Sequence, residues 1–366
     1  MKKIDFIRSL SRASAWIFVI PDSIWDPSRW MLDSSRRPWA MADRRVQHDR
    51  SKKCASHHGY EQTIAHGKGY IVILAWLSLQ GRVVQKEDVV HVFEGNLALR
   101  TAQQPAPLYS FGHFLVDKGN VQGFLVPNWL FNRQRYVSTL IPQLKYGFSD
   151  NFALLAGLPS AIKARDCTAI TSGVGDLFWL LEGAFYTKDT PTYIDAATFL
   201  VGSTFPTGKP NKIPVIFPAG SPNKNPALGF GAPSFFFGLT AHRRSIDWYY
   251  WLNAGATYIA PYQGSRTGSN FIYQAGIGRK IYAVSQKMIV TGMLEFLGLY
   301  TEKDTNCKIK DNTTGSNIIS IAPVFWFSTM HSLFRAGVVI PVIQQVHNKA
   351  DKNLYTATLL FGYTFN

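Results

Sequence analysis

The end of the chain alternates between apolar and mostly polar side chains. One set is apolar, with aromatic residues near both of its ends: Tyr355, Ala357, Leu359, Phe361, Tyr363 and Phe365. The other set is polar or small except for one leucine: Thr356, Thr358, Leu360, Gly362, Thr364 and Asn366. A period of two predicts a β-strand with two different faces. An aromatic-rich apolar face on the last strand is typical of the closing strand of an outer-membrane barrel.

The same alternation recurs upstream, in runs separated by the residues that favour turns. It predicts about twelve strands. They cover residues 119–131, 135–148, 151–160, 173–187, 192–206, 228–241, 245–259, 268–282, 286–301, 315–328, 332–346 and 353–366. Most reach about ten residues, which is long for a globular strand but sufficient to cross a bilayer at a tilt.

The gaps between these strands alternate in length. Short gaps lie at residues 149–150, 188–191, 243–244, 284–285 and 329–331, and longer ones at 161–172, 207–227, 261–267, 302–314 and 347–352. Membrane barrels have short periplasmic turns and longer external loops. We therefore predict an all-β fold, a transmembrane antiparallel β-barrel of about 12 strands over residues 119–366, in the bacterial outer membrane. A soluble β-sandwich is the alternative.

Composition argues against several other classes of protein. Hydrophobic residues make up 46% of the chain, which is too many for a disordered protein. The sequence has no apolar run of about 18 residues, so we do not expect a helical membrane protein. The net charge is +15, but much of the excess lies before residue 70 and the rest falls in expected loops and strand ends. We therefore expect no nucleic-acid partner.

The region before the barrel divides into three parts. Residues 1–65 show neither period, and we expect a poorly ordered extension or a mis-annotated one that results from an upstream start codon. Residues 66–82 place a lysine ahead of a short apolar run, which resembles a signal peptide, with a short buried helix as the alternative. We expect residues 83–118 to form a periplasmic N-terminal segment.

The three cysteines match neither a zinc motif nor a redox motif. In the predicted topology, Cys167 and Cys307 fall in two external loops on the same side of the membrane. They are therefore a candidate disulfide, because this side is not reducing. Cys54 lies in the first region and has no expected partner. No metal site and no cofactor is predicted.

The polar face of the strands supplies the candidate functional residues. If the aromatic-rich faces point outward, a set of charged, polar and aromatic side chains points into the lumen. The set is Asp176, Glu182, Asp247, Tyr249, Trp251, Asn253, Lys280, Glu295 and Arg335. Charges at a constriction can select solutes. The alternative is that these side chains form salt bridges that fill a narrow barrel.

The sequence does not predict an enzyme. Its histidines His113, His242, His331 and His347 are dispersed, and no serine or aspartate near them forms a recognisable nucleophile arrangement. An outer-membrane hydrolase is therefore only the third hypothesis for the function.

Four motifs carry a resemblance to a known family. They are Ser172-Gly173-Val174-Gly175-Asp176, Pro206-Thr207-Gly208, Gly229-Phe230-Gly231-Ala232-Pro233-Ser234 and Gly362-Tyr363-Thr364-Phe365-Asn366. In order and spacing, the chain from about residue 105 to residue 366 resembles the outer-membrane proteins described as transporters of the meta-pathway of phenol degradation. The resemblance implies a barrel for the passage of small compounds, aromatic ones among them. It supplies no catalytic residues.

The function expected from these features is an outer-membrane channel or transporter. It would act by passive or facilitated diffusion of a small solute, hydrophobic or aromatic in character. The alternative is a non-conducting barrel with a structural or surface-interaction role. Expected partners are outer-membrane lipid, lipopolysaccharide near the basic loop 207–227, and the solute. The identity of the solute and the oligomeric state stay open.

Overall fold

The structure is a computed structural model that describes residues 94–132, 135–166, 169–208, 232–261, 265–306, 309–346 and 352–365. The chain divides into two compact units, Met1–Gln62 and Thr63–Asn366, and every described residue belongs to the second. The predictions for residues 1–65, for the signal-like residues 66–82 and for the candidate disulfide Cys167–Cys307 lie outside the described residues.

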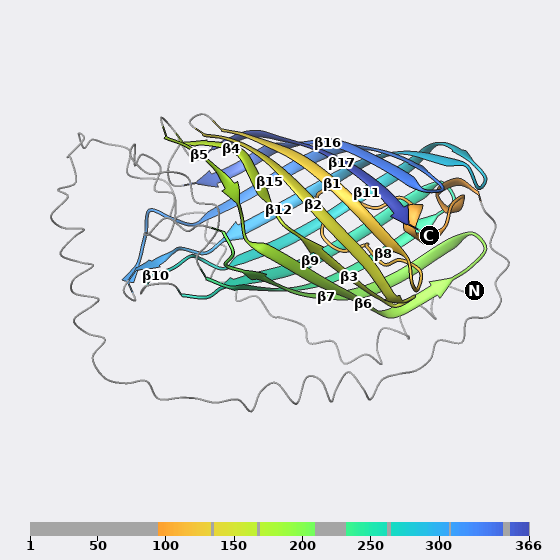
Figure 1. The fold of residues 1–366 in the computed structure, drawn as a ribbon, viewed down its shortest axis with the longest axis horizontal. Helices are drawn as coiled ribbons and strands as arrows, with labels where there is room; N and C mark the ends of the chain where they lie inside the picture. The colour runs from red at the N-terminus through yellow and green to blue at the C-terminus, as the bar shows by residue number, and fades with distance from the viewer. Residues whose placement is uncertain are drawn as a thin grey trace, which may run out of the picture. The chain divides into compact units, whose positions relative to one another are not determined.

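Twelve antiparallel strands form one sheet that closes on itself (Figure 1). The strands are β1 (Val121–Asn132), β2 (Arg135–Ser149), β3 (Phe152–Gly157), β6 (Leu177–Asp189), β7 (Tyr193–Phe205), β8 (Ser234–Ser245), β9 (Trp248–Ile259), β11 (Asn270–Val284), β12 (Met288–Thr301), β15 (Ser316–Thr329), β16 (Ser332–Val346) and β17 (Asn353–Phe365). The first strand, β1, pairs with both β2 and the last strand, β17, so this ring has no free edge. The predicted all-β barrel of about 12 strands is confirmed.

One hairpin extends the ring where a loop was expected. β4 (Ser160–Asp166) continues the line of β3 after Pro159, and β5 (Ala169–Val174) precedes β6. β4 pairs with β2 and with β5, so most of the predicted loop 161–172 is strand. Proline has no N–H to donate, which explains the break between β3 and β4.

Short elements complete the described part of the chain. β10 (Ser265–Arg266), β13 (Thr305–Asn306) and β14 (Ile309–Lys310) form a small sheet in the long loops. Two 3₁₀ turns, η3 (Gly95–Leu97) and η4 (Thr101–Gln103), precede the barrel. Among the residues that the structure describes, no helix has both the length and the apolar character needed to cross a bilayer.

The two faces of the strands differ as the alternation predicted. Along β9, Tyr250 and Leu252 are exposed on the outside, whereas Tyr249, Trp251 and Asn253 between them are buried inside. The closing strand β17 shows the same arrangement, with its outer aromatic side chains exposed. A contiguous exposed apolar surface of this kind would be costly in water and suits contact with lipid.

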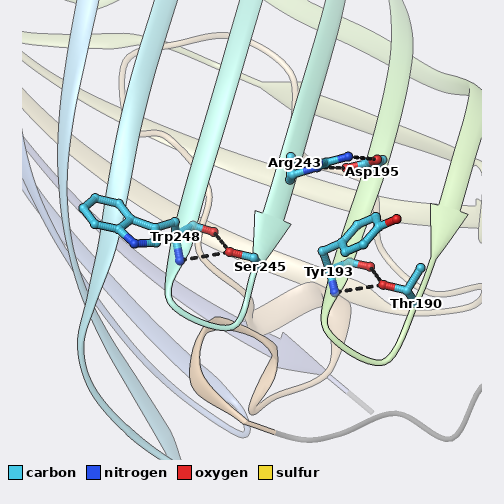
Figure 2. A network of polar contacts seen from close by, with 6 residues as sticks. All are labelled: Thr190, Tyr193, Asp195, Arg243, Ser245 and Trp248. Carbon is cyan, nitrogen blue, oxygen red and sulfur yellow. Dashed lines mark hydrogen bonds and ion pairs between the residues drawn. The ribbon is translucent and has the colours of Figure 1, made fainter. Parts of the chain in front are cut away.

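Hydroxyl groups close two of the short turns, between β6 and β7 and between β8 and β9 (Figure 2). Thr190 Oγ1 accepts a hydrogen bond from the Tyr193 N–H at 3.0 Å and donates one to the Tyr193 carbonyl at 2.7 Å. Ser245 Oγ makes the same pair of contacts with the backbone of Trp248, at 3.1 and 2.9 Å. Each turn thereby satisfies backbone groups where strand pairing stops.

Candidate functional site

Residues 94–118, here called the inner segment, lie inside the barrel against the inner face of its wall. The Asn96 N–H donates to the carbonyl of Ile246 in a short turn, at 2.8 Å. The Gly119 N–H, just past the segment, donates to the carbonyl of Gly147 near another short turn, also at 2.8 Å. The segment therefore enters and leaves the barrel at the end where the short turns lie.

This position differs from the expected one for the described part of residues 83–118, which the sequence placed in the periplasm. The inner segment has neither a helical nor a strand period, because its hydrogen bonds go mainly to wall side chains and not to a neighbouring strand. A segment without a repeating pattern gives no sign of its location in the sequence.

Glu295 on β12 binds residues 108–110 of the inner segment. Its carboxyl group accepts hydrogen bonds from the backbone N–H groups of Leu108 at 2.7 Å, Tyr109 at 3.2 Å and Ser110 at 2.8 Å. The Ser110 hydroxyl adds a fourth hydrogen bond at 2.6 Å. Consecutive N–H groups that converge on one anionic group form a concave anion-binding nest. Glu295 is fully buried, and these donors offset the cost of removing it from water.

Glu182 on β6 binds residues 113 and 114 of the inner segment in the same way. It accepts hydrogen bonds from the N–H groups of His113 at 2.9 Å and Phe114 at 2.7 Å. The hydroxyl of Thr198 on β7 donates a third at 2.7 Å. Glu182 is also fully buried. Two wall carboxyl groups therefore bind the backbone of one inner segment at neighbouring places.

Two wall arginines bind the carbonyl groups of the same segment. Arg244 Nε donates to the Pro105 carbonyl at 3.1 Å, and its Nη1 donates to Gln104 Oε1 at 2.8 Å. Arg335 Nη1 donates to the Pro107 carbonyl at 2.6 Å. Proline has no N–H, so Pro105 and Pro107 present acceptors here without donors that would need a partner. The arginines match this part of the segment for that reason.

A buried histidine pair lies beside the Glu182 contact. The Nδ1 atoms of His113 and His242 are 3.0 Å apart, and His113 Nε2 lies 3.0 Å from Asn253 Oδ1. Asn253 Nδ2 donates to the Phe111 carbonyl at 2.8 Å, which fixes the amide so that Oδ1 faces His113. His113 Nε2 is therefore the protonated nitrogen that donates to Asn253. The two rings contact each other and an amide, and within the described ranges neither ring has a hydrogen bond to a serine hydroxyl of the kind found in a catalytic triad.

The turn at residues 112 and 113 of the inner segment depends on a glycine. Gly112 has a φ of +79°, and the next residue, His113, has a φ of +62°. A Cβ atom on Gly112 would lie 2.6 Å from the Cγ2 atom of Thr240 on β8. Both the backbone conformation and the close approach to the wall therefore require glycine at this position.

Apolar packing fills the space between the segment and the wall. One buried cluster joins Ala106 of the inner segment to wall residues, and Leu108 and Tyr109 pack against it. Its wall members are Phe124, Val126, Tyr249, Trp251, Met293, Val324, Trp326, Leu333 and Leu360. In the part that the structure describes, the half of the barrel with the short turns is therefore filled and not open.

Most of the predicted lumen residues lie where the inner segment contacts the wall. Glu182, Asn253, Glu295 and Arg335 bind the segment directly. The Trp251 Nε1–H donates to the hydroxyl of Ser110 at 3.2 Å. Tyr249 packs in the apolar cluster.

The other three predicted residues lie elsewhere. Asp176 lies between β5 and β6, where its Oδ1 accepts a hydrogen bond from the Gly208 N–H at 3.0 Å. Asp247 and Lys280 form an ion pair at the end with the short turns, and the Asp247 side chain is 59% exposed. The alternation extended the inner face to Asp247, but this residue belongs to the turn that ends the strand pairing.

The residues predicted to line the lumen did not include Lys145, Arg244, Gln274 or the pair His113 and His242. Lys145 had a readable signal, because its neighbours Leu144 and Tyr146 are apolar and face outward. The inner segment gave no such signal. In the described ranges, no group of three or more His, Cys, Asp and Glu side chains is arranged to hold a metal ion.

A closed antiparallel barrel with an apolar outside and a polar-lined inside is a transmembrane β-barrel of the bacterial outer-membrane type. The fold is similar to the COG4313 outer membrane channel from Pseudomonas putida F1, with a TM-score of 0.56 and 12% identity, covering 72% of this chain and 100% of that one. At this identity the likeness concerns the fold alone.

Two further solved structures are similar at a lower level. CdiB from Escherichia coli has a TM-score of 0.32 and 10% identity, over 67% of this chain and 50% of that one. OmpT of Vibrio cholerae has a TM-score of 0.29 and 10% identity, over 71% and 100%. No family model and no curated protein matches the sequence. The resemblance to the phenol-pathway transporters therefore stays a prediction.

Proposed function

We propose that this protein is an outer-membrane channel for a small hydrophobic or aromatic solute, and that the inner segment is its closure. The observation that carries the proposal is the way in which the segment is bound. Glu182, Glu295, Arg244 and Arg335 hold it through hydrogen bonds to its backbone and to two of its side chains. Noncovalent contacts of this kind define one closed position and can be released together.

The energetics favour a closure over a purely structural filling. Burying charged groups costs free energy that apolar residues of similar size would not cost, so buried charges are weak contributors to stability. Directional hydrogen bonds do fix a segment in one register. A barrel that needed only a filled centre would be served by apolar packing alone. The four charged anchors therefore support a segment with a defined resting place.

The composition of the inner wall supports a small apolar solute. Phe124, Tyr249, Trp251 and Trp326 belong to one cluster beneath the inner segment. If the segment moves, it uncovers this aromatic surface, which would favour contact with an aromatic or other apolar group. The Pseudomonas putida protein of similar fold is described as an outer membrane channel, which supports the channel part of the proposal and not the choice of solute.

The test compares conductance and solute uptake in proteoliposomes that contain the wild-type chain or loosened variants. The double variant Glu182→Gln, Glu295→Gln weakens the hold on the segment without changing side-chain size. We expect low flux for the wild type and a rise of at least about a hundredfold for the double variant. Glu302→Gln is the matched control, because its carboxyl group is exposed and pairs with Arg266.

The filled lumen also favours a second candidate function, a non-conducting barrel with a structural role. The two candidates predict different results in the same experiment. If neither the wild type nor the double variant passes ions or small solutes while a control porin does, the channel proposal is wrong and the non-conducting barrel is favoured.

A further inference from the structure

Lys145 on β2 is a buried basic side chain to which the inner segment offers no partner. Its side chain points inward and is only 4% exposed. Among the described residues, its ammonium group has no hydrogen bond or ion pair, and its close contact is the ring of Phe124, with the centroid 5.1 Å away. A buried charge normally has an anionic or hydrogen-bonding partner, because losing water is costly. No described residue therefore pairs with Lys145 Nζ, and this atom is not one of the fully buried unpaired atoms, so a ligand or a water molecule can reach it.

The wall carboxyl groups do not supply this partner. The oxygens of Glu182 accept hydrogen bonds from the inner segment and Thr198. Arg335, three strands away on β16, leaves its Nε–H without an acceptor. This side of the inner wall therefore carries two basic side chains with unused donors.

The surface beside these cations is apolar and aromatic. Phe124 lies under Lys145, and the guanidinium of Arg335 lies 4.2 Å from the ring centroid of Trp326. Phe124 and Leu333 meet over Gly362, where an added Cβ atom would lie 2.7 Å from Phe124 and 2.8 Å from Leu333. A row of apolar side chains therefore runs across neighbouring strands from one cation toward the other.

We propose that Lys145 and Phe124 form a binding subsite for a small aromatic carboxylate. The carboxylate would accept a charge-assisted hydrogen bond from the Lys145 ammonium, and the ring would pack on the aromatic wall. Arg335 adds attraction for the same anion from the other end of the row. An inorganic anion would satisfy the charge but leave the apolar wall uncovered. Binding rests on the proposed function, because the inner segment covers Phe124 and must move before a ring can pack there.

One competing explanation needs no ligand. Gln122 lies opposite Lys145 on β1, and its Oε1 is a buried acceptor with no donor. A water molecule between Lys145 and Gln122 would satisfy both groups. This explanation predicts no preference for an aromatic carboxylate, so ligand binding separates the two.

The experiment is calorimetric titration of the purified full chain in detergent with benzoate, benzyl alcohol and acetate. Benzyl alcohol keeps the ring without the charge, and acetate keeps the charge without the ring. We expect benzoate to bind the wild type at least about tenfold more tightly than either. Lys145→Met should weaken benzoate binding by about tenfold while changing benzyl alcohol binding by less than about threefold.

Two variants control for charge and for folding. Lys145→Arg keeps a cation and should retain benzoate binding within about threefold. Lys280→Met removes a lysine that pairs with Asp247 near the barrel end and should leave all three ligands unaffected. Heat-dependent migration on a denaturing gel reports whether each variant is folded.

The outcomes are decisive for the subsite. Equal binding of benzoate and benzyl alcohol by the wild type overturns it, and so does unchanged benzoate binding by Lys145→Met. Absence of benzoate binding by both the wild type and Glu295→Gln, in which the segment is loosened, also overturns it. Binding of benzoate without flux in proteoliposomes would refute the channel function and leave the subsite standing.

Discussion

Replacing Glu295 with glutamine should release residues 108–110 of the inner segment from the wall. The glutamate accepts hydrogen bonds from three consecutive N–H groups and one hydroxyl with two oxygens. Glutamine keeps one of these oxygens and replaces the other with an NH₂ group, which cannot accept a hydrogen bond. The NH₂ group can donate to the Ser110 hydroxyl, but it meets the backbone N–H of Ser110 as a second donor, so at least this contact is lost. The contacts that remain are no longer charge-assisted.

The expected size of the effect follows from the lost contact and from the lost charge. The lost hydrogen bond removes about 1.5 kcal/mol, and each of the three others weakens by about 0.5 kcal/mol when its acceptor becomes neutral, so the total is about 3 kcal/mol. That free energy corresponds to about a hundredfold increase in the population of the released segment. The barrel strands should be unaffected, because their backbone hydrogen bonds do not involve the Glu295 side chain.

Hydrogen exchange followed by mass spectrometry measures this release directly. Peptides that contain Leu108, Tyr109 and Ser110 should exchange about a hundredfold faster in Glu295→Gln than in the wild type. Peptides from β15 should exchange at the same rate in both, and Glu302→Gln should match the wild type throughout. Unchanged protection of residues 108–110 in the variant would refute the anchoring role given to Glu295.

Two further predictions concern the turn and the histidine pair. Gly112→Ala should speed exchange across residues 111–114 by about tenfold, since alanine disfavours the positive φ and meets Thr240; adding Thr240→Ser should restore only the part that is due to the contact. His113→Phe and His242→Phe should each lower the free energy of unfolding. The double variant should lose about 1 kcal/mol less than the sum of the two single losses, as measured by chemical denaturation, because both single variants remove the same contact. Strict additivity would show that the Nδ1 contact has no energetic role.

The barrel could be predicted from the sequence because its cause is local. Lipid on one side and a polar interior on the other impose a period of two on every strand, and this period is visible in β9 and β17. The strand ends were less visible. Asp247 continues the alternation of β9 into a turn, and the hairpin β4–β5 extends through a stretch that was expected to be a loop.

The inner segment could not be predicted because its contacts are long-range and involve its backbone. Glu295 binds N–H groups about 185 residues away in the chain, and any residue except proline could supply them. Only indirect signs exist in the sequence. Glu182 and Glu295 are isolated acidic residues on strands long enough to cross a bilayer, and a buried acid on such a strand needs a partner. Pro105 and Pro107 mark a stretch that is unsuited to pairing within a sheet.

The distribution of charge over the inner wall links the closure to the solute. Among the described residues, the buried charged or basic side chains of the strands are Glu182, Glu295, Lys145 and Arg244, and Arg335 is partly buried beside them. The inner segment offers backbone N–H groups to both acids and oxygen acceptors to two of the cations, so Lys145 alone receives nothing from it. A closure that had only to fill space would have no reason to leave one cation unmatched. An anion that meets Lys145 would complete the wall in the way that the segment does not, and the same residue would then favour anionic over neutral aromatic solutes.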